Sequence, residues 1–166
     1  MLPISRALLL ALVLFVTSGL GAAAQPLPEP EGPVLLTLSE AGGQTLGLDR
    51  AALAALPATT LRTTTIWTVG PQAFTGVTLR DLMTRFGTRG QAVRAHAAND
   101  YAIDIPWLDV ASGSALIAYA RNGKPMSVRD KGPLWLVYPY DSAPVFRQEI
   151  YHARSVWQLD RVEVIP

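Results

Sequence analysis

The side chains best suited to binding or chemistry lie in three turn-rich segments of this 166-residue chain. Trp67 precedes the sequence Val-Gly-Pro, Asp100 lies within Asn-Asp-Tyr, and residues 127–131 have the sequence Ser-Val-Arg-Asp-Lys. An indole stacks on flat rings, a carboxylate accepts two parallel hydrogen bonds, and cations donate to carbonyl oxygens. Because loops hold a large share of binding residues, these segments are the first candidates for a ligand site.

Several catalytic chemistries are disfavoured by what the sequence lacks. Cysteine is absent, so no thiolate and no disulfide can form. The two histidines, His96 and His152, are far apart in the sequence and predict no dedicated zinc site. Neither a Gly-x-Ser-x-Gly elbow nor a phosphate-cradling glycine loop occurs. Asp100 and Asp104 would share one face of a strand, but this pairing is too weak to indicate acid–base catalysis.

The N-terminus is typical of an exported protein. Arg6 precedes an apolar run at residues 7–16, and the small residues that follow end in Ala-Ala-Ala before Gln25. We therefore expect residues 1–24 to be a signal peptide that is cleaved after Ala24, and we expect a periplasmic location in a Gram-negative cell. The alternative, an uncleaved membrane anchor, is disfavoured because the apolar run is shorter than the ~20 residues of a span.

The remainder predicts a proline-rich leader at residues 25–33 and a single domain at residues 34–166. Without Arg6 the 14 basic side chains become 13, against 13 acidic ones, so the mature chain is near neutral. This balance argues against nucleic acid as a partner.

The order of elements predicts an α+β domain with a mixed, barrel-like sheet core and short peripheral helices. Residues 50–56 form a helix capped by Asp49, residues 79–86 form one capped by Thr78, and a helical turn starts at Pro106. Residues 74–77 resemble a turn. Strands are expected at residues 34–38, 59–67, 93–97, 101–105, 115–119, 134–138 and 156–165. Strands and helices do not alternate strictly, which disfavours a Rossmann-type sheet.

The motifs and their order resemble the molybdopterin-binding domain of the sulfite oxidase type. The resemblance rests on residues 63–70, 74–82, 99–101, 123–139 and 156–159 and covers nearly all of residues 34–165. In that family the first of these segments ends on a cysteine that ligates molybdenum, and Trp67 falls at or beside that position. The resemblance therefore implies a pterin-binding relative that has lost the metal chemistry, because a metal-oxo centre of this kind is held through a thiolate.

Some of the same motifs are similar to a small periplasmic subgroup of this superfamily. They are Asn-Asp-Tyr at 99–101, Ser-Val-Arg-Asp-Lys-Gly-Pro at 127–133 and Trp-Gln-Leu at 157–159. That subgroup includes proteins that bind reduced pterins and regulate a membrane receptor controlling cyclic di-GMP. The resemblance implies a reduced pterin as ligand and the periplasmic domain of a membrane signalling protein as partner.

A pterin is a flat bicycle with two donors and a carbonyl acceptor along one edge. If a pterin binds, Trp67 would stack on it, and Asp100 would accept from the donors with Asn99 and Tyr101 as neighbours. The alternatives are a core tryptophan and an ordinary hairpin turn, in which Asn and Asp merely tolerate the backbone.

Cations and a hydroxyl would complete such a site. Arg129 offers a planar donor fork that Lys131 lacks, and Ser127 offers a neutral hydrogen bond. Arg154 is a further candidate that would close the same pocket. The alternatives are a solvated turn for residues 127–131 and a surface cation for Arg154. The other tryptophans, Trp107, Trp135 and Trp157, are expected to be packing residues.

Three functions remain open from the sequence. The first is a non-enzymatic periplasmic pterin-binding protein that reports ligand occupancy to a membrane partner, with residues 147–154 as a possible contact loop. The second is an oxidoreductase that keeps the molybdenum cofactor without a protein thiolate. The third is an interaction module without a ligand that has kept only the fold.

Overall fold

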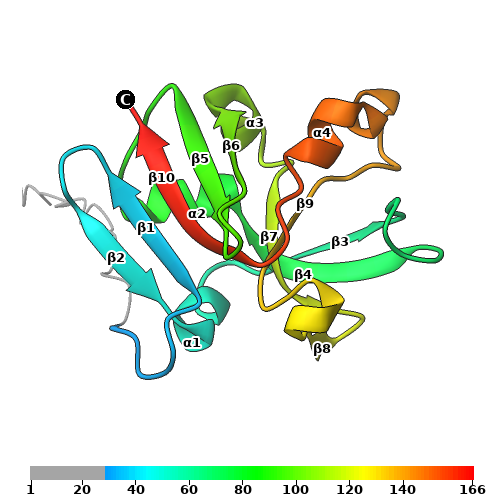
Figure 1. Cartoon of the computed structure of the whole chain (residues 1–166), viewed down its shortest axis with the longest axis horizontal. Helices are drawn as coiled ribbons and strands as arrows, with labels where there is room; N and C mark the ends of the chain where they lie inside the picture. Colours follow the sequence, from blue (N-terminus) through cyan, green and yellow to red (C-terminus); the bar gives the residue numbers. More distant parts are fainter. Residues whose placement is uncertain (1–28) are drawn as a thin grey trace, which may run out of the picture.

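Two five-stranded sheets make up the core of the protein in this computed structural model, which describes residues 29–166. The first sheet consists of β2 (Thr45–Leu48), β1 (Leu36–Glu40), β10 (Leu159–Ile165), β5 (Ala92–Ala97) and β6 (Ala102–Pro106), in that order. The second consists of β3 (Thr59–Thr63), β4 (Gln72–Thr78), β7 (Leu116–Arg121) and β8 (Lys124–Pro125), and β9 (Trp135–Val137) also pairs with β7. The sheets lie beside each other with short helices around them (Figure 1).

The helices are α1 (Arg50–Ala54), α2 (Leu79–Phe86), α3 (Trp107–Ser112) and α4 (Glu149–Ala153), with 3₁₀ turns η1 (Val128–Asp130) and η2 (Pro144–Arg147). Only β1 and β10 pair in parallel; the other pairs of the described strands are antiparallel. The α+β prediction is confirmed. The described strands form two separate sheets and do not close into a barrel.

The predicted helix caps are confirmed. Asp49 accepts from the amide of Ala52 at 2.8 Å, and Thr78 accepts from the amide of Asp81 at 3.1 Å. Helix α2 ends at Gly87, which has a left-handed backbone with φ of 77°. These contacts satisfy amide groups that a helix start leaves unpaired, so the local sequence fixes where both helices begin.

Two segments differ from the prediction. The strand expected at residues 59–67 ends at Thr63, so Trp67 lies in the loop that follows β3. Residues 74–77, expected to be a turn, lie inside β4. Gly76 allows this strand to approach β7, since a Cβ there would lie 2.0 Å from the carbonyl oxygen of Ile117. A glycine that resembles a turn signal locally is required here by the close approach of a neighbouring strand.

Strand ends also shift, and some elements were not predicted. The first strand starts at Leu36, and the last strand starts at Leu159. The sequence analysis did not predict β2, β8, η1, η2 or α4, all of which have five residues or fewer. Such short elements give little periodic signal and depend on tertiary contacts.

The core joins apolar side chains from both sheets and from α1 and α2. Its largest fully buried members include Trp135, Tyr138, Phe74, Leu36, Leu38, Leu53 and Leu82. The expected strand at residues 134–138 is confirmed as the most deeply buried segment, since all five side chains are inaccessible. The prediction that Trp135 packs in the core is confirmed.

The predicted signal peptide, and residues 25–28 of the predicted leader, lie outside the described residues. Within residues 29–166, no helix is both long and apolar enough to cross a membrane.

Replacing Thr78 should test how much its cap contributes to stability. We expect Thr78→Ala to lower the free energy of unfolding by about 1 kcal/mol, because the amide of Asp81 loses its partner. Thr78→Ser should keep most of the stability. Chemical denaturation measures both variants, with the exposed Thr84→Ala in the same helix as a control that should stay within about 0.5 kcal/mol. An equal loss in the Ser and Ala variants would contradict the role of the hydroxyl.

Candidate functional site

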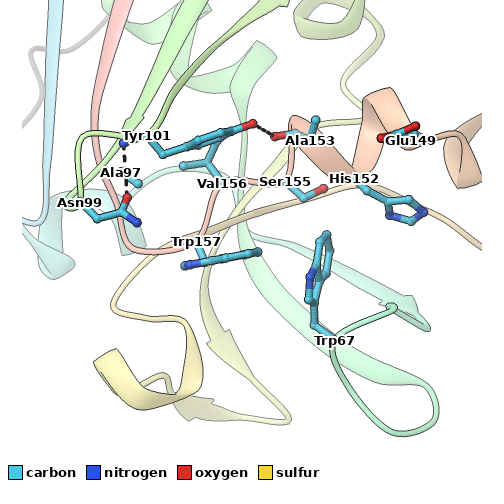
Figure 2. Close-up of a pocket in the computed structure, with 10 residues that line it drawn as sticks. All are labelled: Trp67, Ala97, Asn99, Tyr101, Glu149, His152, Ala153, Ser155, Val156 and Trp157. Carbon is cyan, nitrogen blue, oxygen red and sulfur yellow. Dashed lines mark hydrogen bonds between the residues drawn. The ribbon is translucent and has the colours of Figure 1, made fainter.

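A pocket of about 370 Å³ opens where the loop after β3, the hairpin between β5 and β6, and the segment from α4 to β10 come together. Figure 2 shows the side chains that surround it. The lining residues are Trp67, Ala97, Asn99, Tyr101, Glu149, His152, Ala153, Ser155, Val156 and Trp157. Its volume lies in the ~300–1,000 Å³ range of small-molecule sites.

Trp67 reaches this pocket because its loop is fastened to the chain after β9. The amide and the hydroxyl of Thr64 donate to the carboxylate of Asp141 at 2.6 and 2.7 Å, and the amide of Asp141 donates to Thr63 at 3.2 Å. These bonds hold the pKa of Asp141 below its usual value. The loop therefore has a fixed anchor on the side opposite the hairpin.

The indole of Trp67 is half-buried and lies among four aromatic rings. Its ring centroid is 5.5 Å from Trp157, 5.7 Å from His152, 5.8 Å from Trp135 and 6.5 Å from Tyr140, with interplanar angles of 65° to 86°. Edge-to-face contacts of this kind are favourable beyond simple burial. Trp67 lines the pocket and also packs against the hydrophobic core, and its role in binding a ligand stays a prediction.

The hairpin brings two of the three predicted residues to the pocket. Asn99 and Tyr101 line it, and the Tyr101 hydroxyl donates to the carbonyl oxygen of Ala153 at 3.0 Å. Asp100 occupies the turn with φ of 67°, is exposed, and does not line the pocket. Aspartate tolerates this left-handed backbone, so the turn itself explains the residue type.

The third wall holds residues that the sequence analysis did not select. Glu149, His152, Ser155 and Trp157 all line the pocket. The His152 ring stacks on Tyr140 at 5.2 Å, and its buried Nδ1 has no hydrogen-bond partner among residues 29–166. Trp157 was expected to be a packing residue only. It is half-buried and lines the pocket, and it forms an isolated bridge with Trp135 two residues before β10 begins.

Below this wall lies a buried hydroxyl pair. The Ser155 hydroxyl donates to the carbonyl oxygen of Tyr151 at 2.6 Å, so the Tyr140 hydroxyl donates to Ser155. Burial raises the pKa of Tyr140 to about 12. Tyr140 therefore stays neutral at physiological pH, and its ring stacks on the ring of His152.

The turn at residues 127–131 does not line the pocket. Ser127 accepts from the amide of Asp130 at 3.2 Å, its hydroxyl donates to the Asp130 carboxylate at 2.7 Å, and Arg129 is exposed. Lys131 lies behind the pocket wall, with its ammonium 4.2 Å from the ring centroid of Trp157. The structure thus places Ser127 and Arg129 outside the pocket and brings Lys131 to one of its rings.

Arg154 lies beside the pocket wall and is held by an ion pair. Its Nη1 is 2.8 Å from a carboxylate oxygen of Asp109 in α3, and both side chains are only 15% exposed. Its guanidinium carbon lies 5.6 Å from the ring centroid of Tyr151. This pair connects the end of α4 to α3, so Arg154 is not the surface cation of the alternative interpretation.

The donor groups of this site do not fit a thiolate-held metal. The chain has no cysteine, and residues 29–166 contain no cluster of three or more potential ligands from His, Cys, Asp and Glu. The ring of Trp67, surrounded by four aromatic neighbours, stands at or beside the position where the resemblance implies the metal-ligating cysteine. An indole supplies no metal ligand, so the pocket presents stacking surfaces and hydrogen-bonding groups.

Residues 49–165 match the family described as the oxidoreductase molybdopterin binding domain. The chain belongs to this family, and the resemblance to the sulfite oxidase type is confirmed.

Comparison with solved structures supports the same fold. The crystal structure of the sulfane dehydrogenase SoxCD from Paracoccus pantotrophus aligns with a TM-score of 0.59 and 17% identity. The alignment covers 78% of this chain and 37% of that chain, so the protein spans little more than a third of that chain's length. No match is found among curated proteins.

The residues missed by the sequence analysis had weak local signals. Glu149 and His152 belong to the five-residue helix α4, which gave no recognisable pattern. The segment around Arg154 had been noted, yet only the fold shows that its neighbours line the pocket. Trp157 was expected inside the closing strand at residues 156–165, whereas the observed strand β10 starts only at Leu159.

Replacing Asp141 tests the anchor of the Trp67 loop. We expect Asp141→Asn to lower the melting temperature at neutral pH, because the Thr64 donors lose a charged acceptor. The depressed pKa implies stability that is present above the ordinary value of 3.8 and is lost as the pH falls through the folded-state value. The gap between the wild type and the variant should therefore narrow below pH 3.8, as thermal melts across pH would show. A gap that does not change with pH would contradict the role of the charge.

Proposed function

We propose that this protein is a non-enzymatic, periplasmic pterin-binding protein whose pocket holds a reduced pterin. In this proposal the occupied protein signals to the periplasmic domain of a membrane receptor that controls cyclic di-GMP. The proposal is carried by one observation: a domain of the molybdopterin-binding family has an aromatic-walled pocket where the thiolate would be, and no thiolate.

The size and walls of the pocket support a flat heterocycle. Two indoles, Trp67 and Trp157, line a space of about 370 Å³, and the ring of Tyr101 lies across from Trp157 (Figure 2). Stacking of a base-like ring on an aromatic side chain contributes about 1–3 kcal/mol. Together with a few hydrogen bonds, this suffices for an affinity of roughly micromolar strength.

Polar groups at the rim suit the edge of a pterin. The carboxylate of Glu149 can accept from the paired donors, and the amide of Asn99 can both donate and accept. Asp100 adjoins the lining residues and stays a second candidate for the carboxylate. Because Glu149 lines the pocket and Asp100 does not, the geometry favours Glu149.

The signalling part rests on the resemblance and on what surrounds the pocket. Ile66 next to Trp67 is 68% exposed, and Ile150 next to Glu149 is 43% exposed. A ligand that moved the Trp67 loop or α4 would change the position of these apolar side chains. The segment Arg147–Arg154, which includes α4, is thus the proposed contact with a receptor, and a signal peptide at residues 1–24 would deliver the protein to the same compartment.

Analysis of what copurifies with the protein tests the ligand class. The full chain would be expressed in a Gram-negative host and recovered from the periplasmic fraction. We expect it to release a reduced pterin on denaturation, which oxidation of the extract converts to a fluorescent form. Metal analysis of the same sample should find no stoichiometric molybdenum. Stoichiometric molybdenum would instead support the oxidoreductase alternative. If the protein bound no pterin during purification or in later titration, the interaction-module alternative would be favoured.

Neutralising each carboxylate separately tests which one binds the pterin edge. We expect Glu149→Gln to weaken binding of 7,8-dihydroneopterin about tenfold, because a charge-assisted pair of hydrogen bonds is lost. Asp100→Asn keeps the left-handed turn and should change affinity less than twofold. Fluorescence titration measures both. The reverse order of effects would return the role to Asp100, and no effect from either would reject a carboxylate at this edge.

A further inference from the structure

The indole of Trp157 has two unlike faces. Its ring lies edge-on in Figure 2, with Asn99 and Tyr101 on one side, and all three residues line the pocket. The ammonium of Lys131 lies 4.2 Å from the ring centroid, yet Lys131 does not line the pocket. The cation therefore covers the face directed away from the pocket, and the other face is left open to a ligand.

Hydrogen bonds and close packing connect the turn of Lys131 to the segment of Trp157. The amide of Gln158 donates to the carbonyl oxygen of Lys131 at 3.1 Å, and the side-chain amide of Gln158 donates to the carbonyl oxygen of Val128 at 3.0 Å. Gly132 packs so closely that a Cβ there would lie 2.1 Å from the carbonyl oxygen of Met126. The turn that carries Lys131 and the segment that carries Trp157 thus form one unit, which reduces the ordering cost of ligand binding.

Trp67 is oriented differently from Trp157. The two indole planes meet at 74°, and the other aromatic neighbours of Trp67 also lie at steep angles to it. In Figure 2 the ring of Trp67 stands across the end of Trp157. A flat ligand that lay parallel to Trp157 would therefore contact Trp67 through the ligand's own edge.

We propose that Trp157 is the stacking surface of the pocket and that Lys131, from the opposite face, restricts it to electron-rich heterocycles without positive charge. This inference rests on the proposed function, since it concerns the ligand of the same pocket. Trp67 then forms the end wall that limits the length of the ring system. Lys131 acts through Trp157 and is a positioning and specificity residue.

The physical reason is electrostatic. The face of an indole carries negative charge, which attracts cations and disfavours electron-rich rings. An ammonium on one face draws this density toward itself and makes the opposite face less negative. A cation stacked on the open face would also lie roughly 8 Å from the ammonium, which is about one Debye length at physiological ionic strength, so repulsion persists. A neutral, electron-rich reduced pterin avoids both penalties.

Two variants and two probes test this inference by fluorescence titration. Trp157→Leu should weaken binding of 7,8-dihydroneopterin by about 5- to 150-fold, which corresponds to the loss of one stacked ring. Lys131→Met keeps a long apolar stem over the ring and removes the charge. It should weaken 7,8-dihydroneopterin binding about threefold and strengthen binding of 1-methylquinolinium, a flat bicyclic cation, by at least a similar factor.

Matched controls separate these effects from general damage. Lys124→Met removes the only other lysine of the chain, and Trp107→Leu removes a half-buried tryptophan that does not line this pocket. Neither should change either affinity. Thermal melts identify any variant that fails to fold. If Trp157→Leu does not fold, the affinities of Trp157→Phe and Lys131→Met test the inference in its place.

The outcomes distinguish the inference from the proposed function. Binding of 7,8-dihydroneopterin that is unchanged in folded Trp157 variants, or an unchanged preference between the two probes in Lys131→Met, would overturn the inference and leave pterin binding intact. A wild-type protein that binds no pterin would overturn both.

Discussion

The pocket depends on an aromatic cluster that joins it to the core. Trp67 contacts Trp135, which is fully buried and lies 5.3 Å from Phe74 of β4, so the ligand wall and the centre of the second sheet share one set of edge-to-face contacts. Edge-to-face geometry fixes the angle between rings as well as their distance. The same contacts that stabilise the core therefore also orient the walls of the pocket.

Loops complete the pocket, and each is tied to a different part of the fold. Asp141 holds the Trp67 loop, the Tyr101 hydroxyl ties the hairpin to Ala153, and the pair of Arg154 and Asp109 ties α4 to α3. These polar contacts connect segments of the chain that lie far apart in the sequence. A chain without disulfides obtains a defined site in this way, by packing and by hydrogen bonds between distant segments.

The protein combines a molybdopterin-binding fold with a sequence that contains no cysteine. The family match and the structural alignment define the fold, and the chain has no cysteine that could supply a thiolate. Aromatic rings line the pocket, and polar side chains lie among them. Function follows from the groups in the site, so the fold alone does not decide between catalysis and binding.

The sequence by itself determined the class of fold, the caps of α1 and α2, the buried strand around Trp135, and the grouping of Trp67, Asn99 and Tyr101 at one pocket. These depend on local patterns: a capping side chain, a run of apolar residues, and motifs in a familiar order. The tertiary structure alone decided that Gly76 lies within a strand, that Glu149, His152 and Trp157 line the pocket, and that Lys131 lies behind Trp157. Each of these facts comes from contacts between residues far apart in the chain, on which a local pattern carries no information.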